Sequence, residues 1–91
     1  MDINEARAQI EVIDKEMAAL FEKRMACAKA IAEYKMANNM PIFDAVREQH
    51  LIEKNSAYIE DANMKEYYKD YLIGVMGVSK NYQKEIIGKQ N

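Results

Sequence analysis

Six polar or charged side chains stand on the otherwise apolar faces of the helices that this sequence predicts. A buried charge is costly unless it is paired, so such residues either stay solvated or line a site that receives a partner. The set holds no Ser, Cys or His placed as a nucleophile beside a base, and the chain has no glycine-rich phosphate loop. Cations, an amide and a carboxylate instead favour a site that holds a small anion and stabilises shifting charge. The six residues are Arg24, Lys35, Arg47, Glu48, Ser79 and Gln83.

The first two of these residues lie on a long helix predicted over about residues 2–37. An advance of about 100° per residue places Arg24 at the centre of the apolar stripe, and Lys35 returns to the same face about three turns later. Long cationic side chains also extend from an apolar face into water, so a solvated face and an anion cavity both remain open. The helical spacing of apolar residues is the basis of this prediction. The stripe consists of Ile3, Ala6, Ile10, Ile13, Met17, Leu20, Cys27, Ile31 and Tyr34.

The length of this helix predicts an oligomer. Asp2 is the expected N-cap, with Glu5 as its capping-box partner, and the Asn38-to-Pro41 segment is the expected stop. A helix of about 35 residues is about 50 Å long, whereas a compact chain of this size has a radius of gyration of about 12 Å. The helix therefore extends beyond its own domain, and we expect a homodimer in which the long helices pack side by side.

A second, shorter helix is predicted over about residues 45–59. Asp44 is its expected N-cap, because the carboxylate accepts the free amide hydrogens of the first turn. Arg47 and Glu48 lie at the two margins of the apolar face. They are either an ordinary surface pair or one donor and one acceptor at the rim of a pocket.

A third helix is predicted over about residues 64–87, after a loop over residues 60–63 and a capping box that starts at Asn63. Ser79 falls in the middle of its apolar stripe, and Gln83 follows one turn later at the edge. Ser79 either faces a ligand or hydrogen-bonds back to its own helix. The sequence therefore predicts an all-α chain of one long and two shorter helices that form a single domain, residues 1–91.

Composition excludes several functional classes. The 91 residues fit one small domain, and 49% hydrophobic with 31% charged residues is typical of a soluble helical protein. A net charge of −2 without a basic block disfavours nucleic-acid binding. No membrane-spanning run and no secretory signal are expected. Cys27 is expected to be a small buried residue in a reducing cytoplasm, and the lone His50 gives no support for a metal site.

Short motifs along essentially the whole chain resemble the all-helical chorismate mutases. Each motif alone is weak, but their order and spacing together are specific, and the motif at the start of the second helix is the sharpest. The resemblance implies an intertwined homodimer of three-helix chains with two active sites. It implies the rearrangement of chorismate to prephenate, in phenylalanine and tyrosine biosynthesis, without a cofactor. The motifs are Ala6-Arg7, Ile10-Glu-Val-Ile13-Asp14, Leu20-Phe-Glu-Lys-Arg24, Ala32-Glu-Tyr-Lys35, Pro41-Ile-Phe-Asp44-Ala-Val-Arg47-Glu48 and Ser79-Lys-Asn-Tyr-Gln83.

The same resemblance implies a role for each cation of the first helix. Arg24 binds one substrate carboxylate, Arg7 reaches in from the other subunit to bind the second, and Lys35 contacts a carboxylate and the ether oxygen. Arg24 and Lys35, together with Gln83, are the expected catalytic residues. Arg7 and Arg24 are seventeen residues apart, which is about 25 Å along one helix. One small dicarboxylate cannot touch both on a single chain, whereas an antiparallel neighbouring helix brings them together.

The remaining roles implied by the resemblance fall on the two shorter helices. Glu48 and the backbone at Asp44 hold the ring hydroxyl of chorismate. Ser79 assists carboxylate binding, and Gln83 donates to the ether oxygen. Arg47 matches the motif without a defined role.

Two alternative functions remain open at this point. Relatives of the family act as isochorismate–pyruvate lyases with similar cationic clamps, and Asp44 with Glu48 favours the mutase over these. The other alternative is a dimerisation or regulatory module without chemistry. The presence of every expected contact residue argues against it. The chain ends soon after Gln83, so we expect no further enzymatic domain after it.

Overall fold

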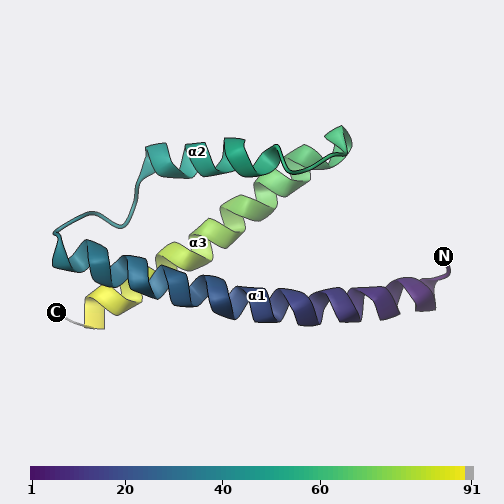
Figure 1. Ribbon diagram of the computed structural model, residues 1–91, viewed down its shortest axis with the longest axis horizontal. Helices are drawn as coiled ribbons and strands as arrows, with labels where there is room; N and C mark the ends of the chain where they lie inside the picture. The colour runs from purple at the N-terminus through teal and green to yellow at the C-terminus, as the bar shows by residue number, and fades with distance from the viewer. Residues whose placement is uncertain (90–91) are drawn as a thin grey trace.

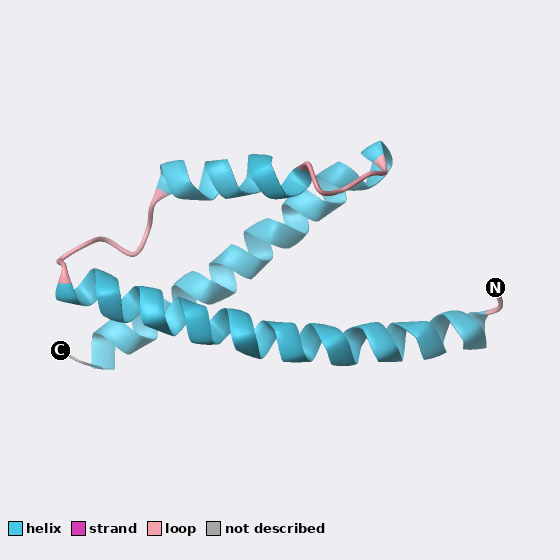
Figure 2. Ribbon diagram, viewed as in Figure 1, coloured by secondary structure: helices cyan, strands magenta, loops and turns pink. Residues whose placement is uncertain are grey.

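The computed structural model describes residues 1–89, which form three α-helices and one 3₁₀ turn without a strand. Figure 1 shows α3 crossing diagonally between α1 and α2, and Figure 2 shows that loops account for little besides the connections. α3 packs against both other helices, whereas no Cα atom of α1 comes within 8 Å of a Cα atom of α2, both helices being described in full. The predicted all-α class is confirmed. The elements are α1 (Ile3–Ala37), α2 (Ala45–Ser56), η1 (Ala62–Met64) and α3 (Lys65–Lys89).

Both ends of α1 follow from local sequence. The Asp2 carboxylate accepts the Glu5 amide hydrogen at 2.8 Å, as an N-cap does. At the other end, the Asn38 amide donates to the Tyr34 carbonyl at 3.1 Å. Asn39 then takes the left-handed conformation, with φ of 53°, and Pro41 follows two residues later. This αL residue and the proline stop the helix where the sequence predicts.

α2 starts at the predicted cap and ends earlier than predicted. Asp44 accepts the Arg47 amide hydrogen at 3.0 Å. The helix ends at Ser56, and the turn that follows it is closed by a bond from the Ile59 amide to the Ser56 carbonyl at 3.2 Å. The apolar side chains at 58 and 59 continue a helical pattern in sequence, but their backbone lies in a turn. The predicted end at about residue 59 is therefore three residues too late.

The chain then begins a new turn before α3. The Asp61 carboxylate accepts the Asn63 amide hydrogen at 2.9 Å and caps η1. Asn63 thus lies inside a 3₁₀ turn, and the prediction that it starts a capping box is wrong.

At the far end of α3, a Glu85–Lys89 contact of 2.9 Å lowers the pKa of Glu85 and raises that of Lys89 through their hydrogen bond.

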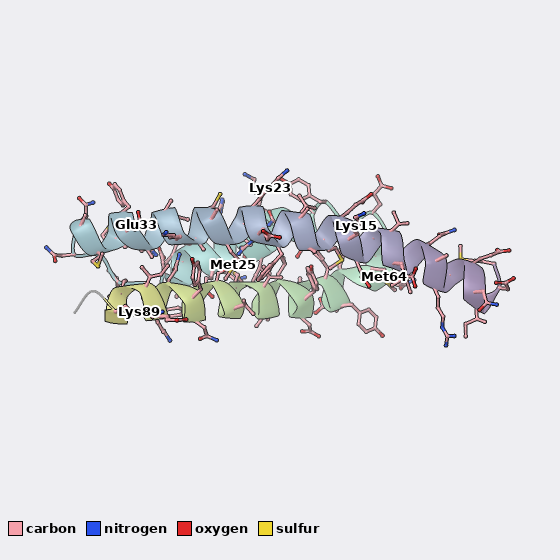
Figure 3. All side chains as sticks on the ribbon, turned by 90° about the horizontal axis from the view of Figure 1, so that it is seen from below. Lys15, Lys23, Met25, Glu33, Met64 and Lys89 are labelled. Carbon is pink, nitrogen blue, oxygen red and sulfur yellow. The ribbon has the colours of Figure 1, made fainter. Side chains whose placement is uncertain are left out.

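The core of the single chain is small. Within the described residues, the buried apolar side chains are Ala28 and Ala32 of α1 and Leu72 and Met76 of α3. Small residues on α1 let the two helices approach closely. Figure 3 shows Met25 between α1 and α3, while Lys23 projects from the opposite side of α1.

Much of the predicted apolar stripe of α1 is exposed to solvent in the single chain. Ile10, Ile13 and Leu20 are 53%, 50% and 61% exposed. The chain measures 52 × 25 × 14 Å and has a radius of gyration of 16.2 Å, well above the value of about 12 Å for a compact chain of this length. Within the described residues, no helix has the length and apolar character that a membrane crossing requires.

Candidate active site

A cavity of about 480 Å³ lies between the three helices. It brings together seven of the eight predicted site residues, from segments up to 59 positions apart in sequence. Apolar side chains complete its walls. The lining residues are Arg24, Cys27, Ala28, Ile31, Lys35, Ile42, Asp44, Arg47, Glu48, Leu51, Met76, Ser79, Lys80 and Gln83.

Arg24 links α1 to α3 at one end of the cavity. Its guanidinium donates to the Ser79 hydroxyl, which in turn donates to the Val75 carbonyl at 3.1 Å. Ser79 therefore both bonds back to its own helix and faces the cavity, so the two sequence-based interpretations are compatible. Arg24 is exposed rather than buried, which corrects the expectation of a core-facing cation in the single chain. A guanidinium has five N–H donors, so most of them remain available to an anion.

Lys35 stands at the other end of the same face of α1. Its ammonium donates to the Ile42 carbonyl at 2.8 Å, and the side chain is half-buried. This bond ties α1 to the segment that leads into α2. An ammonium has three donors, so Lys35 fixes this connection and retains hydrogens for a ligand.

Gln83 is the buried polar residue of the site. It is 7% exposed, and its side-chain nitrogen donates to the Ala28 carbonyl at 3.0 Å. One hydrogen of the amide is thus engaged by α1. The second hydrogen is a fixed donor at the cavity wall, because the first bond sets the plane and orientation of the amide.

The start of α2 supplies the carboxylates. The Asp44 side chain caps α2, so the groups of Asp44 that can contact a ligand in the cavity are its backbone and the remaining lone pairs of its carboxylate. Glu48 forms an ion pair with Lys80 of α3, with Nζ at 3.1 Å from Oε2 and 3.2 Å from Oε1. Lys80 also lies 4.7 Å above the centre of the Phe43 ring. Arg47 lines the cavity from an exposed position.

Lys80 is the charged lining residue that sequence reasoning missed. The sequence pattern placed Ser79 in the middle of the apolar stripe of α3 and gave Lys80 no role. In the structure the buried positions are Leu72, Met76 and Gln83, a face rotated toward Lys80. Its position four residues after Met76 and three before Gln83 is the signal that would have found it.

The lining charges favour a doubly negative ligand. The cavity wall carries four cations and two carboxylates, which leaves an excess of two positive charges. The Lys80–Glu48 pair accounts for one cation and one carboxylate. A cavity with partly apolar walls strengthens the attraction between such an excess and a small dianion.

Arg7 and Cys27 are two further positions that the sequence analysis singled out. Arg7 does not line the cavity of the single chain, as its distance from Arg24 along α1 requires. Cys27 is exposed and lines the cavity, so the expectation that it is buried is wrong. Among residues 1–89, no group of three His, Cys, Asp or Glu side chains gathers as a metal site would require.

Comparison with known proteins gives one match. A family model described as chorismate mutase type II matches residues 6–84. The match begins one residue before Arg7 and ends one residue after Gln83, so it includes every predicted site residue. The searches of curated proteins and of solved structures found no significant match. The resemblance drawn from the sequence motifs is confirmed at the level of the family.

Proposed function

The chain belongs to the chorismate mutase type II family, and from this premise we propose that it rearranges chorismate to prephenate in aromatic amino-acid biosynthesis. The observation that carries the proposal is the convergence of Arg24, Lys35 and Gln83 on one cavity with a positive excess. These groups are donors and fixed charges. The reaction is an intramolecular rearrangement that needs restraint and charge stabilisation and no covalent intermediate.

The two carboxylates of chorismate define how it is held. Arg24 binds one carboxylate with the N–H groups that Ser79 leaves free, and the Ser79 hydroxyl assists from α3. Glu48 and the backbone at Asp44 accept and orient the ring hydroxyl. Holding both ends of the molecule imposes the folded conformation in which the reacting carbons meet, which removes much of the entropic barrier.

Charge develops on the ether oxygen as the carbon–oxygen bond breaks. Lys35 and Gln83 donate to this oxygen with hydrogens that their contacts to Ile42 and Ala28 leave available. Because both donors are already oriented, they stabilise the transition state more than the ground state. Loss of one such donor costs about 3 kcal/mol, or about a hundredfold in rate.

We further propose an intertwined homodimer that delivers Arg7 from the partner subunit. The exposed apolar stripe of α1 and the extended shape of the single chain support it. A second cavity of about 420 Å³, lined mainly by apolar side chains, opens between α1 and α3 on the other side of Arg24 and Ser79. A partner helix inserted there places its Arg7 beside this chain's Arg24.

The test is the loss of chorismate absorbance after addition of the purified protein, with prephenate identified as the product. Turnover by the wild type and its loss in Arg24→Ala support the proposal. A folded, dimeric protein that leaves chorismate unchanged contradicts it. Isochorismate supplied in parallel checks the reaction type, because release of pyruvate from it, without turnover of chorismate, identifies a lyase.

A further inference from the structure

Lys80 holds a place in the site that neither the sequence motifs nor the family match assigns. We propose that Lys80 is a positioning residue, which fixes the Glu48 carboxylate and the start of α2 so that Glu48 receives the ring hydroxyl of the substrate. This inference rests on the proposed mutase function, because the substrate gives Glu48 its task. It adds a residue of α3 to the part of the site that binds the ring hydroxyl, which the motifs place on α2 alone.

The geometry of the pair is that of a carboxylate held at both oxygens. Lys80 Nζ lies 3.1 Å from Oε2 and 3.2 Å from Oε1 of Glu48. The two side chains are 28% and 23% exposed, so the pair is screened less than an ion pair on the surface. A carboxylate held at both oxygens has lost its rotational freedom. Each oxygen keeps a lone pair with which it accepts a further hydrogen bond from a hydroxyl.

Lys80 also ties together elements that have few other connections. No two Cα atoms of α1 and α2 lie within 8 Å of one another, and the N-cap bond at Asp44 is internal to α2. The segment before α2 is held from α1 by Lys35, which bonds the Ile42 carbonyl. From α3 it is held by Lys80, whose ammonium contacts Glu48 and lies 4.7 Å above the Phe43 ring, within reach of a cation–π attraction.

The charge on Lys80 resolves a conflict in the site. Glu48 stands in a cavity that must accept a dianion, and an uncompensated carboxylate would repel it. Lys80 neutralises Glu48 locally and leaves Arg24 and Lys35 to face the substrate carboxylates. Removal of Lys80 leaves the Glu48 charge uncompensated and frees the Glu48 side chain to rotate, so both of its effects on binding act through Glu48.

A competing role for Lys80 is a direct contact with a substrate carboxylate. In that case its contribution does not depend on Glu48. The positioning role predicts the opposite. Lys80 then acts through Glu48, so its removal has little effect on substrate binding once that carboxylate is gone. A double-mutant cycle separates the two roles, since contacting residues couple and independent ones add.

The experiment measures kcat and KM for chorismate with Lys80→Met, Glu48→Gln and the double variant. Lys80→Met should lower kcat/KM about tenfold, mainly through KM, because the hydroxyl contact exists in both the ground and transition states. In the Glu48→Gln background the same change should alter KM less than about twofold. Lys80→Arg, which keeps the charge, should recover most of the loss.

Lys69→Met is the matched control, because Lys69 lies on the same helix in an ion pair of 3.2 Å with Glu66 and does not line the cavity. It should leave kcat and KM unchanged. Circular dichroism checks the fold of each variant, and Lys80→Gln takes the place of Lys80→Met if the latter does not fold.

Each outcome has one meaning. An unsubstituted protein that does not convert chorismate overturns the proposed function and this inference with it. Normal conversion by the wild type, with Lys80→Met unchanged, overturns this inference alone. An equal loss with and without the Glu48 carboxylate also overturns it, because Lys80 then acts on the substrate directly.

Discussion

The side-chain nitrogen of Gln83 on α3 donates to the Ala28 carbonyl of α1 at 3.0 Å. The contact is buried, and it joins the two helices at the level of the cavity. A glutamine amide has no titratable proton, so its donor hydrogens are present at every ordinary pH. The packing of α1 on α3 and the orientation of a proposed catalytic donor therefore depend on the same bond.

Replacement of this amide should make turnover depend on acid. In Gln83→Glu the ionised carboxylate has no hydrogen to donate and faces the Ala28 carbonyl. Only its protonated form restores a donor, so activity should be low at neutral pH and should rise as the pH falls. The wild type should show no such rise. A pH profile of kcat for both proteins checks this, and a variant with the wild-type profile would contradict the donor role.

Loss of Lys35 should lower kcat about a hundredfold, because a transition-state donor disappears. Lys35→Met keeps the aliphatic length and removes the charge together with the bond to Ile42. Lys29→Met is the control, since Lys29 is exposed on α1 and does not line the cavity. The kcat values of the two variants, measured by steady-state kinetics, should differ about a hundredfold. Similar kcat values for both would remove Lys35 from the mechanism.

Arg24→Leu separates an active site from a helical scaffold. Arg24 is exposed, and Ser79 keeps its bond to Val75 when the guanidinium is removed. Thermal stability should therefore hold or rise, whereas kcat/KM should fall by a hundredfold or more through loss of a carboxylate contact. Melting curves and kinetics are measured on the same preparation. A loss of activity that merely follows a loss of fold would argue against a direct contact.

Mixing two inactive variants tests the contribution of Arg7 across subunits. Arg7→Ala and Arg24→Ala should each be inactive as homodimers. When they are unfolded and refolded together, half of the dimers pair the two chains and contain one intact site, so about a quarter of the wild-type activity should return. Separately refolded proteins, mixed afterwards, are the control. No recovery in a mixture shown to contain heterodimers would contradict the shared site.

The features that sequence predicts well are those set by near neighbours. The Asp2 and Asp44 caps and the stop after Asn38 depend on residues within one turn, so local chemistry decides them. The end of α2 at Ser56 was missed because an apolar pattern continues beyond it, while the backbone already turns toward the Asp61 cap.

The Lys80–Glu48 pair was missed for a different reason. The two residues are 32 positions apart, and they meet only because α3 is rotated so that Met76 and Gln83 face inward. A rotation of this kind depends on tertiary packing and not on the periodicity of α3. The sequence motifs identify the residues of the proposed site, whereas the contacts among these residues follow only from the three-dimensional structure.

The Cα atoms of α1 and α2 stay more than 8 Å apart, and α3, which packs on both helices, sets the width of the cavity between them. The bulk of side chains on the inner face of α3 therefore governs which substrates fit. Met76 is buried there and lines the cavity wall. Trimming this side chain would enlarge the cavity without removing any charged residue, so selection or design for a bulkier substrate would begin at Met76.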